Sequence, residues 1–172
     1  MGAEVWGWPY SLTTLGSGFQ VDLQERWKSL WAKSPQRGHM DKIDAKLPLH
    51  SFLAATNHLS RAETSVLMQL RMGHIPLNAF LHRIGRADSP GCPTCQHTNK
   101  MIHHYLFDCP GHAQARHSLV RALGWNSKSI RHLLGNWQSY KSVLKYVHMT
   151  GRFKSIYGDL PMWPAPDGAP PP

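Results

Sequence analysis

The sequence contains few cysteines and no long apolar run. Three of its 172 residues are Cys, and because an odd number of thiols cannot pair completely, a framework of disulfide bonds is disfavoured. The roughly 18 consecutive apolar residues that a membrane span requires occur nowhere, which rules out such a span. No basic segment precedes an apolar stretch at the N-terminus, so we do not expect a secreted protein.

Acidic residues are scarce relative to basic ones. The chain has 19 Lys and Arg against 10 Asp and Glu, a formal net charge of +9. Between residues 100 and 154 nine basic residues accompany a single acidic residue, Asp108. Such a surplus attracts polyanions and speeds encounter with them, so it favours nucleic-acid binding. The charges are spread over several segments instead of one dense run, which argues against a membrane surface as partner.

Apolar residues between the two ends of the chain recur at the helical period. This spacing predicts helices over residues 23–31, 49–53, 66–70, 77–84, 115–123, 127–134 and 137–147. Ser60 and Glu63 match a capping box ahead of the third of these, and Gly73 suits its C-terminal end. No segment sustains the alternation of a strand, so we predict a small all-α fold.

We expect five parts along the chain. Residues 1–20 lack basic residues and a sustained period and are expected to be an irregular leader. Residues 21–87 form a helical region, 88–112 a zinc knuckle and 113–158 a basic helical region. Residues 159–172 are rich in proline and are expected to be a disordered tail.

All three cysteines lie in one short segment that also holds histidines. The pattern is C-x2-C-x8-H-x4-C, formed by Cys92, Cys95, His104 and Cys109. Two Cys separated by two residues can hold one metal ion through a tight turn, and the His and the third Cys complete a tetrahedron. Thiolate and imidazole donors favour Zn²⁺, so we predict one structural zinc ion. Four protein ligands leave no open coordination position, which argues against a zinc hydrolase.

The identity of the histidine ligand is the open choice in this segment. His97 and His103 lie nearby, and His112 follows the last cysteine. We favour His104, because its four-residue spacing to Cys109 is that of zinc knuckles. The alternative for the whole segment is three reduced thiols beside an ordinary histidine.

Several stretches of the chain match one protein family in the same order. They are residues 25–28, 69–78, 81–90, 92–95, 103–110 and 150–159. On these stretches residues 21–160 resemble the C-terminal region of non-LTR (LINE-type) retrotransposon reverse transcriptases, including those of fungi. In that family the segment follows the polymerase, often after a ribonuclease H domain, and is described as a zinc-binding region. The resemblance implies zinc ligation by the same four residues and a role in holding element RNA or target DNA during target-primed reverse transcription.

Residues that would carry that family's catalysis are missing. A polymerase needs paired carboxylates that bind two metal ions, and no two acidic residues are adjacent here. A ribonuclease H needs a cluster of four acids, whereas the ten acids of this chain are scattered. We therefore expect a non-catalytic fragment without a small-molecule substrate, located in the nucleus or otherwise in the cytoplasm. A transposon remnant without function is a further alternative.

The predicted function is zinc-dependent binding of RNA or single-stranded DNA. The residues expected to contact nucleic acid are Lys100, His103, Tyr105, Arg116, Arg121, Lys128, Arg131, Lys141, Lys145, Arg152 and Lys154. Tyr105, Phe107 and Trp125 are candidates for stacking on unpaired bases. Core packing is the alternative, favoured for Phe107 and left even for the other two. A second hypothesis is a protein-interaction module that packs on a reverse-transcriptase polymerase domain.

Overall fold

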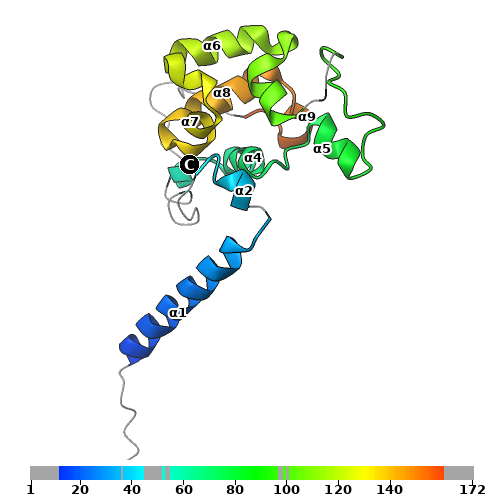
Figure 1. Cartoon of the computed structure of the whole chain (residues 1–172). Helices are drawn as coiled ribbons and strands as arrows, with labels where there is room; N and C mark the ends of the chain where they lie inside the picture. Colours follow the sequence, from blue (N-terminus) through cyan, green and yellow to red (C-terminus); the bar gives the residue numbers. More distant parts are fainter. Residues whose placement is uncertain are drawn as a thin grey trace, which may run out of the picture. The chain divides into compact units, whose positions relative to one another are not determined.

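The computed structural model describes residues 12–35, 37–44, 52, 55–96, 99 and 101–160, which divide into two units at residue 37 (Figure 1). Within these residues the regular structure is helical, and the one β feature is an isolated bridge between Gly91 and Asn99. The predicted all-α fold is confirmed. No helix in the described part of the chain is both long enough and apolar enough to cross a membrane.

The first unit contains one long helix, α1 (Leu12–Ala32). Its end ahead of Pro35 agrees with the sequence pattern, but its start corrects the prediction of an irregular leader through residue 20. No proline interrupts the chain between Pro9 and Pro35, so a helix formed over residues 23–31 can propagate towards the N-terminus. Residues 1–11 of the expected leader lie outside the described residues.

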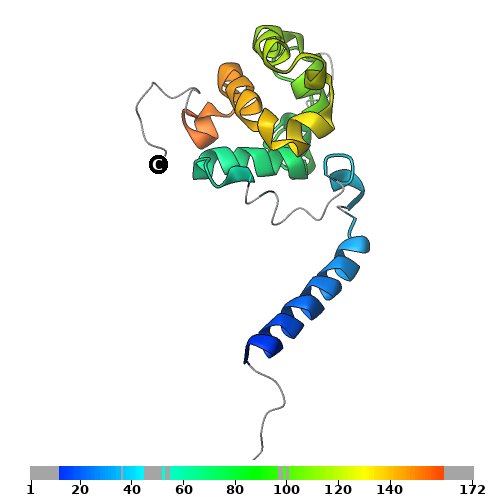
Figure 2. The ribbon, with the colours of Figure 1, turned by 90° about the vertical axis from the view of Figure 1, so that its left-hand side faces the viewer.

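The second unit is built from short helices. They are α2 (Arg37–Met40, at the boundary), α4 (Arg61–Met72), α5 (Asn78–Arg83), the π-helix η1 (His104–Asp108), the 3-10 helix η2 (Pro110–His112), α6 (Ala113–Leu123), the 3-10 helix η3 (Gly124–Lys128), α7 (Ile130–Gly135), the 3-10 helix η4 (Trp137–Ser139), α8 (Tyr140–Thr150) and α9 (Lys154–Tyr157). The helix α8 packs against α4, α6 and α7, as both views of the ribbon show (Figures 1 and 2). The core therefore lies around α8.

The start of α4 follows the predicted capping box. The Ser60 hydroxyl accepts a hydrogen bond from the backbone N–H of Glu63, and the Glu63 carboxylate accepts one from the backbone N–H of Ser60 at 2.8 Å. Gly73 ends the helix, as its position predicted. The apolar stripe of Val66, Leu67 and Leu70 is fully buried.

Two predicted boundaries differ from the structure. The helix expected over 127–134 is interrupted at Ser129, whose extended backbone separates η3 from α7 and whose side chain caps α7. Residues 159 and 160, expected to begin the disordered tail, instead belong to the packed fold, because Leu160 is buried in the core and Asp159 pairs with Lys154 at 2.9 Å. Residues 161–172 lie outside the described residues. Of the short helix expected at 49–53, Phe52 alone is described, and it is helical and buried.

A buried arginine joins several elements of the second unit. Arg71, on α4, is 1% exposed. Its guanidinium donates hydrogen bonds to the Tyr140 hydroxyl on α8 at 2.9 Å, to the carbonyl of Leu134 on α7, and to the carboxylate of Asp44 at 3.1 Å. It also lies 4.8 Å from the centre of the Phe52 ring. One planar group with several donors can satisfy these partners together, which an ammonium cannot.

Replacing Arg71 by Met should therefore lower the free energy of unfolding by about 3 kcal/mol, because the hydrogen bonds that the guanidinium donates to Asp44, Tyr140 and Leu134 are lost. Urea unfolding followed by circular dichroism measures the change. Arg61→Met, at an exposed position of the same helix, is the control and should change the free energy by less than about 0.5 kcal/mol. Equal effects of the two substitutions would contradict the assigned role of Arg71.

Candidate metal centre

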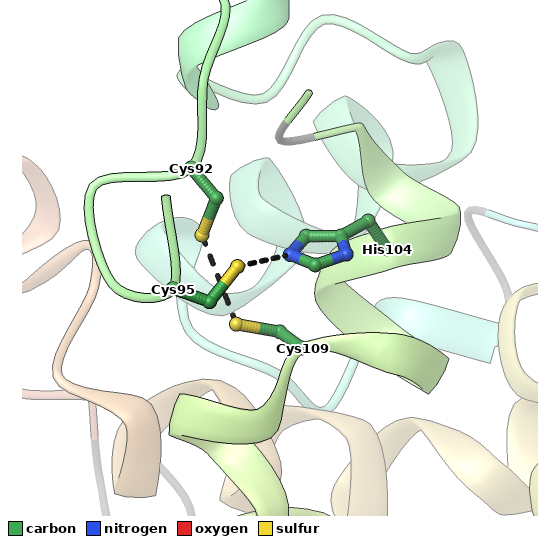
Figure 3. A group of neighbouring side chains, drawn as sticks. All are labelled: Cys92, Cys95, His104 and Cys109. Carbon is green, nitrogen blue, oxygen red and sulfur yellow. Dashed lines mark hydrogen bonds between the residues drawn. The ribbon is translucent and has the colours of Figure 1, made fainter. Parts of the chain in front are cut away.

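Three cysteines and one histidine converge on one point of the second unit. The thiol sulfurs of Cys92, Cys95 and Cys109 and a ring nitrogen of His104 all lie within 4.8 Å of one another (Figure 3). Cys92, His104 and Cys109 are buried, and Cys95 is half-buried. The structure thus brings together the four residues predicted as ligands, and this cluster can hold one metal ion.

Distances between the donor atoms fit a tetrahedral ion. Metal–sulfur bonds of about 2.3 Å and metal–nitrogen bonds of about 2.05 Å, as in zinc sites, give tetrahedron edges of about 3.8 Å between sulfurs and about 3.6 Å from sulfur to nitrogen. The sulfurs of Cys92 and Cys109 are 3.7 Å apart, and the sulfur of Cys95 is 3.4 Å from Nε2 of His104. These two donor pairs are therefore already spaced as tetrahedral ligation requires, and all four donors lie within 4.8 Å of one another.

The first two ligands are presented by a tight turn. The backbone N–H of Gln96 donates to the carbonyl of Cys92 at 2.8 Å, and Gln96 adopts a left-handed φ of 59°. Gly111 lies against this turn, where a Cβ atom would come within 2.1 Å of a methyl group of Thr94. A residue without a side chain is therefore needed for the chain after Cys109 to approach the turn.

The other two ligands are presented by a single π-helical turn. The backbone N–H of Cys109 donates to the carbonyl of His104 at 2.8 Å, a hydrogen bond over five residues. The π-helical turn η1 places two residues that are five positions apart, here His104 and Cys109, on the same side of the helix. An α-helix with 3.6 residues per turn does not. The x4 spacing read from the sequence is thus matched by the local geometry.

The surroundings of the Cys92 thiol favour its thiolate form. Burial raises its pKa, but hydrogen bonds from the backbone of Cys95 and Thr94, together with the side chains of His104 and Cys95, outweigh burial and lower the pKa to about 5. The thiolate is the form that binds metals, so this environment favours ligation at neutral pH.

His103 faces away from the cluster. Its ring nitrogen Nδ1 lies 2.9 Å from the Asp108 carboxylate, and its side chain is exposed. His112 is buried but stands edge-on to the Tyr105 ring, and His97 lies outside the described residues. His104 is therefore the histidine that the structure places among the sulfurs.

Arg116, expected to contact nucleic acid, instead contacts the metal centre. Its Nη2 donates to the carbonyl of Cys109 at 2.7 Å, and its Nη1 is buried without a hydrogen-bond partner in the described part of the chain. Three thiolates, a neutral imidazole and a divalent ion would carry a net charge of −1, which this half-buried guanidinium would balance. No sequence pattern predicted this role, because it depends on where α6 places Arg116 relative to the carbonyl of Cys109.

Tyr105 is a correction to the predicted nucleic-acid contacts. Its side chain is completely buried, and burial raises the pKa of its hydroxyl, which lies 2.7 Å from the Thr150 hydroxyl. Its ring packs edge-on against Tyr146 and Phe153. It is a core residue beneath the metal centre and cannot stack on a base. Phe107 also packs against the core, as favoured from the sequence.

The remaining predicted contacts fall into three groups. Arg152 is half-buried and donates to the side-chain oxygen of Asn78 at 3.0 Å, and Lys100 lies outside the described residues. The exposed positions are His103, Arg121, Lys128, Arg131, Lys141, Lys145 and Lys154. Among the predicted contacts, the exposed Lys and Arg residues therefore all lie between α6 and α9.

No family model, curated protein or solved structure matches the chain. The resemblance to reverse transcriptases therefore stays a prediction from the sequence. The metal centre itself rests on the geometry of its four side chains.

Purified protein should contain one divalent metal ion per chain, and His104→Ala should lose it. Removing a residue that hydrogen-bonds to a metal ligand lowers metal affinity by about 10- to 100-fold, and removing the ligand itself should lower it further. Elemental analysis and competition with a chromophoric chelator measure both quantities. His103→Ala is the matched control and should keep its metal. A metal-free wild type, or equal losses in the two variants, would contradict the assignment.

Replacing Arg116 by Met should weaken metal binding by about 10- to 100-fold, because the carbonyl of Cys109 keeps the N–H of His112 but loses its charged donor, and the centre loses its counter-charge. The same chelator competition measures the affinity. Arg121→Met, at an exposed site of the same helix, should bind metal like the wild type. Unchanged affinity in Arg116→Met would show that its hydrogen bond does not support the centre.

Proposed function

We propose that the chain is a non-catalytic module that binds RNA or single-stranded DNA and is held in shape by one zinc ion. The observation that carries the proposal is the charge of residues 109–158, which include eight Lys and Arg and no Asp or Glu. Six of these basic residues are exposed: Arg121, Lys128, Arg131, Lys141, Lys145 and Lys154. A surface of this kind supplies the sequence-independent part of nucleic-acid affinity.

The packing of the helices brings several basic segments together. Lys141 and Lys145 are four residues apart on α8, so they emerge from the same face of that helix. The helix α6, which carries Arg121, packs against α8, and η3, which carries Lys128, contacts α6 and α7. Cations from different parts of the sequence are thereby held on one packed group of helices.

Zinc is the ion that we propose for the Cys/His cluster. Three thiolates with one imidazole suit a borderline-soft tetrahedral ion better than Mg²⁺ or Ca²⁺, which prefer oxygen donors. When bound, the ion supplies a covalent-like crosslink between the turn at residues 92–95 and η1. With all four positions filled by side chains, its role is structural.

A polymerase domain is the second partner expected from the sequence, and one observation favours it. On α1 the apolar side chains Phe19, Leu23 and Leu30 are exposed, and the rings of Trp27 and Trp31 stack 5.7 Å apart. Such a helix offers apolar surface to another protein. We rank this role second, because nucleic-acid binding accounts for the basic surface and protein packing does not.

Binding of the zinc-loaded chain to a labelled single-stranded RNA should weaken steeply with salt. If the five exposed cations other than Lys154, which pairs with Asp159, each neutralise one phosphate, the logarithm of the association constant should fall with the logarithm of salt with a slope of about −3.5. Lys141→Gln combined with Lys145→Gln should make the slope shallower by about 1.4. Fluorescence anisotropy at several salt concentrations measures both slopes.

Lys28→Gln, on α1, serves as the control and should leave the slope nearly unchanged, since that lysine already pairs with Glu25 at 2.8 Å. No binding at low salt, or affinity that ignores salt, would overturn the proposed function.

A further inference from the structure

A tryptophan is displayed on the surface between α6 and α7. Trp125 lies in η3 and is 85% exposed, the highest value among the large apolar side chains that the structure describes as exposed. An indole ring has a large apolar face that water solvates poorly, and burial of this face on a partner is favourable. Exposure alone does not make a binding site, so the surroundings of the ring decide what it can bind.

The turn that carries Trp125 is fixed on both sides. Gly124, which precedes it, has a φ of +57° that other residues rarely adopt. The buried Ser127 donates from its hydroxyl to the carbonyl of Gly124 at 2.6 Å, and Ser129 caps the next helix. Because this backbone is already ordered, a ligand that binds the indole does not have to order the loop first.

A cation lies over the ring. Nζ of Lys128 is 4.6 Å from the centre of the Trp125 ring, within the range of a cation–π interaction. With the side chain so exposed, the lysine covers one face and leaves the opposite face open to solvent. Arg121, one helical turn before Trp125, is also exposed, and no acidic residue occurs between residues 109 and 158.

We propose that Trp125 and Lys128 form a stacking site for one unpaired base of a single-stranded nucleic acid. The open face of the indole stacks on the base, and the ammonium group neutralises a neighbouring phosphate. Both contacts are tolerant of sequence, because every base has a flat face and every nucleotide a phosphate. The site rests on the proposed function and deepens it, since a stacking site selects single strands over duplexes, whose base faces are already covered.

The test compares zinc-loaded Trp125→Leu with the wild type on a mixed-sequence single strand of twelve nucleotides and on the duplex of the same sequence. Leucine keeps an apolar side chain but cannot stack. The affinity for the single strand should fall at least about fivefold, the affinity for the duplex should change less than about twofold, and the salt slope should stay the same. Trp125→Phe should retain part of the single-strand affinity.

Trp137→Leu is the matched control, since Trp137 is also exposed, at 60%, but lies outside this turn. It should bind both ligands like the wild type. Lys128→Gln should make the salt slope shallower by the amount that about one phosphate contact contributes. Circular dichroism and metal content should be unchanged in all these variants, because the substituted side chains are exposed.

The outcomes separate this proposal from the proposed function. A wild type that binds no nucleic acid at low salt overturns both. Salt-dependent binding in which Trp125→Leu matches the wild type overturns the stacking site and leaves the proposed function standing. An equal loss of affinity for single strand and duplex also overturns the stacking site, because removing a contact with an unpaired base cannot weaken binding to a duplex, which has none.

Discussion

The convergence of four donor atoms between residues 92 and 109 is the constraint on which this part of the chain depends. Three thiols and an imidazole lie within 4.8 Å of one another, and Cys92 favours its thiolate form. Thiolates this close repel one another unless a cation lies between them. Little regular structure holds the segment besides η1 and the bridge between Gly91 and Asn99. Binding of a metal ion to this cluster would therefore be coupled to local folding, and its free energy would contribute directly to the stability of the segment.

The same turn that carries two ligands is anchored to the basic helices. In η1 the carbonyl of Tyr105 accepts a hydrogen bond from the Tyr146 hydroxyl on α8, and Arg116 on α6 donates to the carbonyl of Cys109. The rings of Tyr105 and Tyr146 pack edge-on, 5.2 Å apart. A metal ion that fixes η1 thereby helps to fix α6 and α8 relative to one another. This is how a structural ion can support a binding surface that it does not touch.

Local features of this molecule could be predicted from its sequence, and long-range ones could not. The capping box at Ser60, the helix end at Gly73 and the spacing of the four donors each depend on residues close in the chain. The burial of Tyr105 depends on Thr150, 45 residues later, and the position of Arg152 on Asn78, 74 residues earlier. Tyrosine and arginine are as common in binding surfaces as in packed interiors, so their residue types gave no signal.

The arginines and lysines that follow the metal centre differ in what most of them contact. Arg116, Arg131 and Arg152 each donate to an oxygen of the protein itself, as their planar forks allow. The lysines at 128, 141, 145 and 154 are exposed, and an ammonium group acts as a strongly hydrated point charge. Point charges attract phosphates without reading base edges, so a surface dominated by lysine binds many sequences alike. Any preference for one form of nucleic acid must then come from another kind of group. In the proposed stacking site Trp125 would be that group, since a flat exposed ring distinguishes unpaired bases from paired ones.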